Sequence, residues 1–221
     1  MIVDERIITF INSLDTKNSE ILEDIEREAL ADNVPIIRRE MQSFLKVLLM
    51  VKKPMRVLEV GTAVGFSALL MSEYVPEECA ITTIENYEKR IPIARQNFVR
   101  AGKEKKITLL EGDAMDVLKT LEGPYDFIFM DAAKGQYIHY LPEILSLLAK
   151  GGILVSDNVM QDGDVIESRF AVERRDRTIH ARMREYLYEL KHNDALVTSI
   201  IPLGDGVALS VKKEVGTDIA Q

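Results

Sequence analysis

The sequence predicts an α/β fold built on a doubly wound, mostly parallel sheet. From residue 55 onward, short apolar runs without polar alternation recur between helical segments, a pattern typical of parallel strands that helices cover on both faces. The first fifty residues instead repeat apolar side chains at helical spacing only, which predicts an N-terminal helical cap. Near the end, two apolar runs flank a Leu-Gly-Asp-Gly turn, which predicts a closing β-hairpin and an antiparallel edge.

The N-terminal cap is expected over residues 1–51, as three helices. Asn18 and Ser19 are good N-caps for the second helix, and Pro35 separates the second helix from the third. The apolar stripes that define the three helices are Ile7, Ile8, Ile11 and Leu14, then Ile21, Leu22, Ile25 and Leu30, then Ile37, Met41, Phe44, Leu45, Leu48 and Leu49.

The α/β core is expected over residues 55–213. Five predicted strands cover 55–60, 80–84, 107–110, 126–130 and 152–156, and the predicted helices between them cover 66–74, 87–101, 115–121 and 137–149. A polar helix over 177–192 precedes the two hairpin strands at 196–202 and 207–212. No linker or repeat divides the chain, so residues 1–221 are interpreted as a single domain.

The composition disfavours several classes of protein. The 221 residues carry a net charge of −8, which argues against nucleic-acid binding over the whole surface but does not exclude a local basic patch. The single cysteine, Cys79, has no partner for an internal disulfide, and no apolar run reaches the ~20 residues of a membrane span. Acidic residues stand where a signal peptide would be basic, so we expect a cytoplasmic protein with no membrane partner.

The first candidate ligand site lies at the carboxyl ends of the first three predicted strands, where sheets of this kind bind ligands. Gly61 and Gly65 allow a tight turn and a close backbone approach after the first strand. A dinucleotide site would have glycine where this chain has Ala63, which argues against an NAD-dependent dehydrogenase. Glu85 either holds ribose hydroxyls, as an acid at this distance does in nucleotide folds, or is a solvated strand end. Asp113 either accepts from an adenine amine or caps the next helix.

The second candidate site combines oxygen ligands from the next two strand ends. Asp131 follows the fourth predicted strand, and Asp157 and Asn158 follow the fifth. Two carboxylates and an amide oxygen suit a hard divalent cation and leave positions for water and substrate. Lys134 would then lie beside the ion as a candidate general base. The alternative interpretation makes the two aspartates helix caps and Lys134 a solvated surface residue.

These residues resemble the class I S-adenosylmethionine-dependent O-methyltransferases of the cation-dependent type, which include catechol and caffeoyl-CoA O-methyltransferases. The resemblance extends over residues 35–213 and implies a seven-stranded sheet with an antiparallel last strand, and a homodimer. The matching motifs are Val57-Leu-Glu59-Val-Gly61, Glu85, Gly112-Asp113-Ala114, Asp131-Ala-Ala-Lys134-Gly-Gln-Tyr137, Asp157-Asn158 and Pro202-Leu-Gly-Asp205-Gly206.

The resemblance also implies a role for each matching position. Asp131, Asp157 and Asn158 would hold Mg²⁺ or another divalent cation, and Lys134 would be the general base. Asp131 would also lie beside the cofactor at the reacting group. The S-adenosylmethionine site would be lined by Ile37, Gly61, Ser67, Glu85, Asp113, Ala114 and Asp131.

Within that family, the resemblance is strongest to the bacterial tRNA 5-hydroxyuridine methyltransferases. They share the Val34-Pro35-Ile36 motif and an arginine-rich stretch before the last helix. The implied acceptor is 5-hydroxyuridine at the wobble position of tRNA, which methylation converts to 5-methoxyuridine. Because a catechol offers the same pair of adjacent oxygens, a small phenolic substrate stays open as the alternative.

The arginine-rich stretch is the candidate contact for RNA. If the chain is helical from Arg174 onward, one stripe of the helix carries Arg174, Arg177, Arg184 and Lys191. Phe170 and Tyr137 could stack a base beside it. The alternative is an ordinary solvated helix face, which charged stretches usually form. A non-catalytic RNA-binding module is disfavoured, because the net charge is negative and the set of metal ligands is intact.

Overall fold

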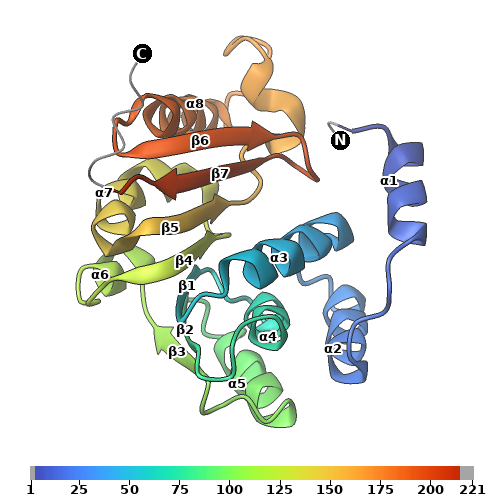
Figure 1. The fold of residues 1–221 in the computed structure, drawn as a ribbon. Helices are drawn as coiled ribbons and strands as arrows, with labels where there is room; N and C mark the ends of the chain where they lie inside the picture. The colour runs from blue at the N-terminus through green and yellow to red at the C-terminus, as the bar shows by residue number, and fades with distance from the viewer. Residues whose placement is uncertain (1–2, 215–221) are drawn as a thin grey trace.

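The computed structural model describes residues 3–214 and contains one seven-stranded sheet (Figure 1). The strand order is β3-β2-β1-β4-β5-β7-β6. Strands β1 to β5 pair in parallel, whereas β7 is antiparallel to its neighbours β5 and β6, which confirms the predicted sheet. The strands are β1 (Arg56–Val60), β2 (Ala80–Glu85), β3 (Ile107–Glu111), β4 (Tyr125–Met130), β5 (Leu148–Ser156), β6 (Leu196–Ile201) and β7 (Val207–Lys212).

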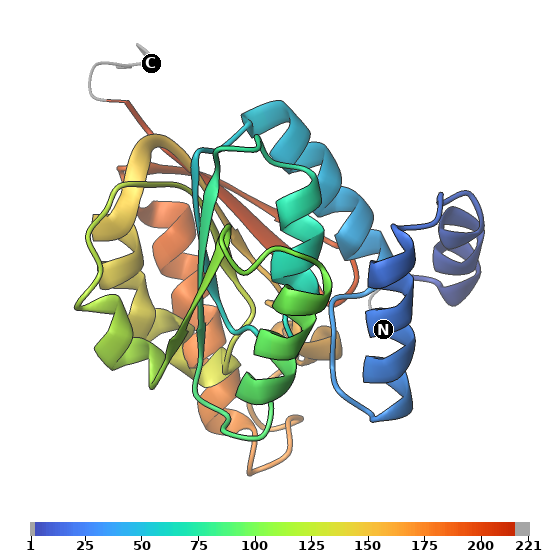
Figure 2. The ribbon, with the colours of Figure 1, turned by 90° about the horizontal axis from the view of Figure 1, so that it is seen from below.

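Helices cover both faces of the sheet, and two short helices of the N-terminal cap lie outside one of these layers (Figure 2). One layer consists of α3 (Arg39–Lys52), α4 (Phe66–Glu73) and α5 (Ile91–Arg100). The other consists of α6 (Ala114–Leu118), α7 (Tyr137–Leu147) and α8 (Arg177–His192). The outer cap helices are α1 (Glu5–Ser13) and α2 (Glu20–Ala31), and the short 3₁₀ helices are η1 (Lys134–Gln136) and η2 (Gln161–Ile166).

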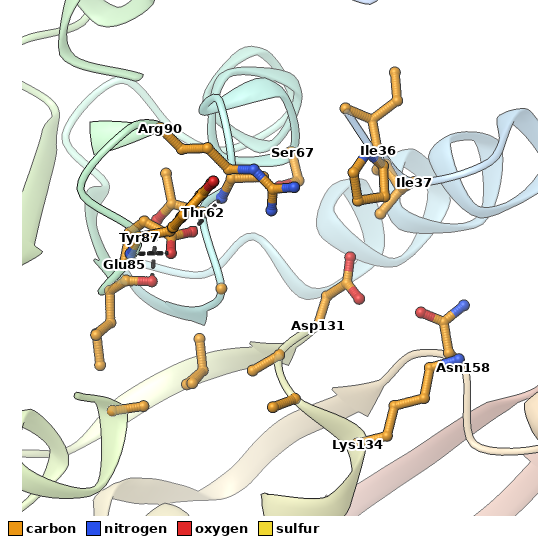
Figure 3. A pocket seen from close by; sticks show the side chains of 18 of the residues that line it. Ile36, Ile37, Thr62, Ser67, Glu85, Tyr87, Arg90, Asp131, Lys134 and Asn158 are labelled. Atoms are coloured by element: carbon orange, nitrogen blue, oxygen red, sulfur yellow. Dashed lines mark hydrogen bonds between the residues drawn. The ribbon is translucent and has the colours of Figure 1, made fainter. Parts of the chain in front are cut away.

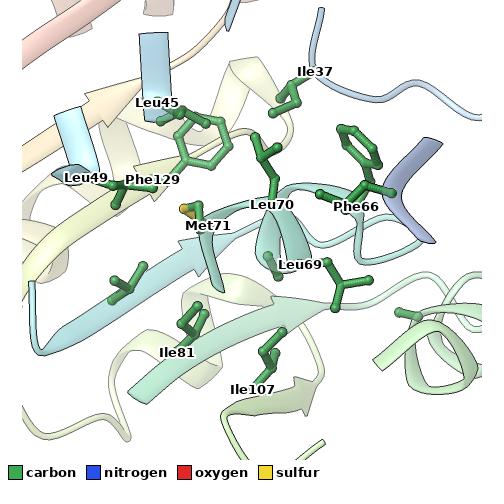
Figure 4. Close-up of a cluster of buried hydrophobic side chains, with 14 of the residues drawn as sticks. Ile37, Leu45, Leu49, Phe66, Leu69, Leu70, Met71, Ile81, Ile107 and Phe129 are labelled. Atoms are coloured by element: carbon green, nitrogen blue, oxygen red, sulfur yellow. The ribbon is translucent and has the colours of Figure 1, made fainter. Parts of the chain in front are cut away.

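The core consists of two apolar clusters, one on each face of the sheet. In β4, Phe127 and Phe129 belong to one cluster, and Ile128 and Met130 belong to the other. All four side chains are fully buried, and this explains why the strand shows no polar alternation in the sequence. Figure 4 shows the first cluster, where Leu45 of α3 packs close to Phe129.

Two elements begin four residues away from their predicted starts. The helix predicted from residue 87 begins at Ile91, because residues 87–90 form a turn closed by the Arg90 amide bonded to the Tyr87 carbonyl at 2.8 Å. Pro92 then occupies the first turn of α5, the part of a helix where a missing N–H costs nothing. Strand β5 begins at Leu148, four residues before its predicted start at 152.

Helix α1 has an apolar side that the rest of the described chain leaves uncovered. None of its residues is buried, and Ile7, Phe10 and Ile11, together with Leu14 at its C-cap, are exposed. A homodimer could cover this side, and the dimer stays a prediction. Within residues 3–214, no helix is both long and apolar enough to cross a membrane.

Candidate functional site

A cavity of about 700 Å³ opens at the carboxyl ends of the central strands (Figure 3). It contains most of the residues that the sequence analysis placed in the two candidate sites. Asp113 lies instead in an adjoining pocket, and Asp157 is buried, with 5% of its surface exposed. The predicted site residues that line the cavity are Ile37, Gly61, Ser67, Glu85, Ala114, Asp131, Lys134 and Asn158.

The loop after β1 is held in place by Glu85 at the tip of β2. One oxygen of the Glu85 carboxylate accepts from the Ala63 amide at 2.7 Å, and the other accepts from the Asn86 and Tyr87 amides. Ala63 itself adopts a left-handed conformation with φ 48°, which is uncommon without glycine. Glu85 is therefore not an ordinary solvated strand end, because it fixes the loop that faces the cavity.

Beneath this loop, Glu59 connects three elements of the site. Its two oxygens accept hydrogen bonds from the Ser67 hydroxyl of α4, at 2.5 Å, and from the Thr83 hydroxyl of β2. Burial raises the pKa of Glu59 to about 7, although both hydroxyls favour the charged form and so act in the opposite direction. Ser67 is thus oriented by a carboxyl group that is largely protonated in mildly acidic solution.

We expect Glu59 to make the protein less stable as the pH rises. Because the pKa of Glu59 is near 7 in the folded chain and near 4.5 when unfolded, the folded state binds more protons between these values. Its stabilising effect is complete below pH 4.5 and is lost as the pH rises to 7, about 3 kcal/mol in total.

The test is urea unfolding of the wild type and of Glu59→Gln between pH 4 and 8. The difference in unfolding free energy between the two proteins should change by about 3 kcal/mol in favour of the variant as the pH rises. Parallel stability curves would show that Glu59 does not titrate between these limits.

Asp113 acts as a helix cap, which is one of the two roles considered for it. Its side chain accepts from the Met115 amide at 2.9 Å at the start of α6. The neighbouring Ala114 lines the main cavity. The adenine contact suggested for Asp113 stays a prediction.

The proposed metal ligands lie at the ends of two adjacent strands. Met130 is paired with Ser156 in the parallel register, and the Asp157 amide donates to the Met130 carbonyl at 2.9 Å. Asp131 and Asp157 therefore follow neighbouring positions of β4 and β5, whose backbones are about 4.8 Å apart. Asn158 turns into the cavity with φ 57°, and Figure 3 shows its amide and the Asp131 carboxylate facing the same space.

The electrostatics of this group fit a cation. Burial raises the pKa of Asp131, and burial together with the negative charge of Asp131 raises the pKa of Asp157. Two buried carboxylates, one of which opposes the ionisation of the other, are a fitting environment for a divalent ion. Within residues 3–214, no group of three His, Cys, Asp or Glu residues could hold a metal, so such a site would need the amide oxygen of Asn158.

Lys134 lies in η1, four residues after the end of β4, and is not a solvated surface residue. About a third of its side chain is exposed, and its Nζ lies 3.1 Å from Oδ2 of Asp205. Its positive charge favours the ionised forms of Asp131 and Asp157. The lysine is therefore within electrostatic range of both aspartates.

The predicted arginine stripe is wrong in its first member. Helix α8 begins at Arg177, so Arg174 lies in the preceding loop. Arg177 and Arg184 do share a helix face, but each donates to a backbone carbonyl: Arg177 to Val172 at 3.3 Å and Arg184 to Val165 at 2.8 Å. These two hydrogen bonds fix the chain segment before α8 against the helix. The two arginines therefore have a structural role, whether or not they also contact RNA.

Tyr137 was wrongly predicted as a base-stacking residue. Its side chain is fully buried, and its hydroxyl bonds to the carbonyls of Met130 and Asp157 at 3.1 and 3.2 Å. The tyrosine therefore braces the two strand tips from below. The other candidate, Phe170, is 85% exposed.

Several cavity residues were not predicted from the sequence, and Asp205 is the most informative of them. It belonged to a motif quoted for the family resemblance, but nothing in the sequence gave it a contact or a role. Tyr87 and Arg90 lie two and five residues after Glu85, and that position was the only signal for them. The unpredicted polar or charged lining residues include Arg38, Tyr87, Arg90, Asp162 and Asp205.

The chain is similar to known enzymes over nearly its whole length. A family model described as O-methyltransferase matches residues 12–213. A catechol O-methyltransferase from Niastella koreensis is 34% identical over 128 residues, which cover 56% of this chain and 58% of that enzyme. Caffeoyl-CoA O-methyltransferase 2 from Populus trichocarpa is 33% identical over 183 residues, covering 75% of this chain and 70% of that enzyme.

A solved structure shows the same likeness. The SAH-bound methyltransferase of Podospora anserina matches with a TM-score of 0.86 and 27% sequence identity. The match covers 95% of each chain. The likeness therefore includes both the sheet and the helices that position the cavity.

Proposed function

The chain belongs to the O-methyltransferase family, and from that premise we propose that it uses a divalent cation, Mg²⁺ by preference, to transfer the methyl group of S-adenosylmethionine to a hydroxyl group with an adjacent oxygen. The observation that carries the proposal is a single cavity. The loop after β1, which Glu85 holds in place (the Glu85 loop), lines one end of it, and the other end is lined by Asp131, Lys134 and Asn158 (Figure 3). Donor and acceptor can therefore meet in a single site.

The cofactor end of the cavity suits a nucleoside. Glu85 stands at the strand tip where an acid holds ribose hydroxyls, and the loop that it fixes brings the backbone of Gly61 close to the ligand space. Ile37 adds an apolar side chain to the lining of the cavity. Adenine would then lie toward Ala114 and the adjoining pocket beside Asp113.

The acceptor end suits a pair of oxygens. Asp131, Asp157 and Asn158 would hold the divalent cation, which when bound would lower the pKa of the acceptor hydroxyl and orient it. As a neutral amine, Lys134 would accept the hydroxyl proton at Nζ, so that the O–H bond breaks as the acceptor oxygen attacks the methyl carbon. The carbon–sulfur bond of the cofactor breaks in the same step, and its electron pair stays on sulfur. The enclosing residues hold both reactants in line, an effect worth up to ~7–11 kcal/mol.

For the acceptor itself, we propose 5-hydroxyuridine at the wobble position of tRNA. The support is the sequence resemblance together with an exposed rim after η2, where Phe170, Arg174 and Arg175 are accessible to a large substrate. A catechol-type phenol is the second candidate, because the relatives named above act on catechol and caffeoyl-CoA by their names. Both acceptors offer adjacent oxygens.

The experiment compares methyl transfer to tRNA from cells that lack the modification with methyl transfer to catechol. Transfer to tRNA should be the faster reaction, and treatment with EDTA should abolish it until Mg²⁺ is restored. Calorimetry with S-adenosylmethionine in EDTA would check that the cofactor still binds. Turnover that persists after chelation would rule out the cation, and turnover of catechol alone would rule out the tRNA acceptor.

A further inference from the structure

The turn between β6 and β7 brings a buried carboxylate into the acceptor end of the cavity. Asp205 lies in this turn with 3% of its surface exposed, and it lines the cavity together with Lys134. We propose that Asp205 is a positioning residue, which holds the amine of Lys134 where it meets the acceptor hydroxyl. The inference rests on the proposed methyl transfer.

Both oxygens of Asp205 are in use. Oδ2 lies 3.1 Å from Nζ of Lys134, and Oδ1 accepts a hydrogen bond from the backbone amide of Asp162. A carboxylate so deeply buried is stable only when it is paired and hydrogen-bonded. The pairing therefore fixes the direction in which Asp205 points, and with it the place of the lysine amine.

The backbone of the turn is equally constrained. The carbonyls of Asp205 and Gly206 accept from the amides of Met160 and Val159, both at 2.9 Å. Gly206 packs so closely on Met160 that an added Cβ would meet the Met160 backbone nitrogen at 3.0 Å. Because Val159 directly follows Asn158, the turn is locked to the strand tip that carries two of the proposed cation ligands.

A lysine needs such an anchor more than most side chains do. Its four-carbon stem carries about 2 kcal/mol of rotamer entropy, and Lys134 stands in a short 3₁₀ helix with about a third of its side chain exposed. Among the residues described, Asp205 is the only one that forms a salt bridge with the Lys134 amine. The same contact is a hydrogen bond from Nζ to Oδ2, which the neutral amine also donates. Without it, Nζ would reach the acceptor oxygen in only some of its conformations, and misplacement by 1 Å can cost about 100-fold in rate.

The test is the substitution Asp205→Asn, which keeps the shape and can still accept from the Asp162 amide but removes the charge beside Lys134. We expect kcat for the acceptor to fall about 10- to 100-fold, with the Kd for S-adenosylmethionine and the acceptor KM within about twofold of wild type. The matched control is Glu40→Gln, a buried carboxylate of α3 beside Gly204 in the same turn, which should leave kcat within about twofold.

A double-mutant cycle separates positioning from structural support. If Asp205 acts through Lys134, the substitution Asp205→Asn should change kcat by less than about twofold in a Lys134→Ala background. An undiminished loss in that background would overturn the proposal, and so would a single variant Asp205→Asn with wild-type kcat. If the wild type transfers methyl to neither tRNA nor catechol, the proposed function itself fails, and this inference fails with it.

Discussion

Replacement of Lys134 with alanine is expected to lower kcat about 10²- to 10⁴-fold, the usual contribution of a positioned general base. Nζ of Lys134 is the only amine on the acceptor side of the described cavity, and alanine leaves nothing there to accept the hydroxyl proton. Affinity for S-adenosylmethionine should stay within about twofold, because the lysine does not face the Glu85 loop. Steady-state methyl transfer and calorimetry on the same preparation measure the two quantities.

The matched control is Lys105→Ala. Lys105 is exposed in the loop before β3. This loop lies at the amino ends of the parallel strands, whereas the cavity lies at their carboxyl ends. Removal of the Lys105 side chain should therefore leave both kcat and cofactor affinity unchanged. If Lys134→Ala lost cofactor affinity and turnover by equal factors, the lysine would be a binding residue and not the base.

The substitution Gly61→Ala is expected to have the largest effect on stability. Gly61 has φ +101°, and a Cβ at this position would lie 2.8 Å from the carbonyl carbon of Asp131 and closer still to its oxygen. Gly61 directly follows β1 and Asp131 directly follows β4, so neither backbone can move aside without displacing the end of its strand. Unfavourable φ and overpacking each cost about 1–3 kcal/mol, so we expect a loss of roughly 2–6 kcal/mol in unfolding free energy, measured with urea.

Gly102→Ala separates the two contributions. Gly102 also has a positive φ, +64°, but no atom lies within 4 Å of an added Cβ. The Gly102→Ala variant should lose about 1 kcal/mol of unfolding free energy, from the backbone conformation alone. Equal losses at Gly61 and Gly102 would show that the contact with Asp131 carries no energy. Any Gly61→Ala protein that still folds should also lose turnover, because Asp131 would be displaced.

Much of this site could be predicted because a parallel sheet gathers its strand ends. Once the apolar runs are recognised as parallel strands, Glu85, Asp131 and Asn158 are seen to stand at their carboxyl ends. Because these ends lie on the same side of the sheet, the sequence alone predicts that the three residues lie near one another. The first strands were predicted almost to the residue because each is a short unbroken apolar run, and the bounds predicted for α8 are those observed.

The remaining features depend on contacts that periodicity cannot show. Asp205 meets Lys134 across 71 residues of sequence, and only the insertion of β7 beside β5 brings them together. Tyr137 begins a helix, and the pattern does not say whether its ring faces the cavity or the core. The loop before α8 holds Arg174 outside the helix, because the α-helical backbone begins only after Asp176.

The position of β7 between β5 and β6 has a consequence for synthesis on the ribosome. Strands β1 to β5 emerge first and can pair with one another, but the free edge of β5 has no partner until residues up to 212 have left the exit tunnel. The nascent chain thus exposes an unpaired edge, which is prone to association with other chains. The turn that carries Asp205 directly precedes β7. A chain stalled before this turn could therefore form the cofactor end of the cavity, but its acceptor end would lack Asp205.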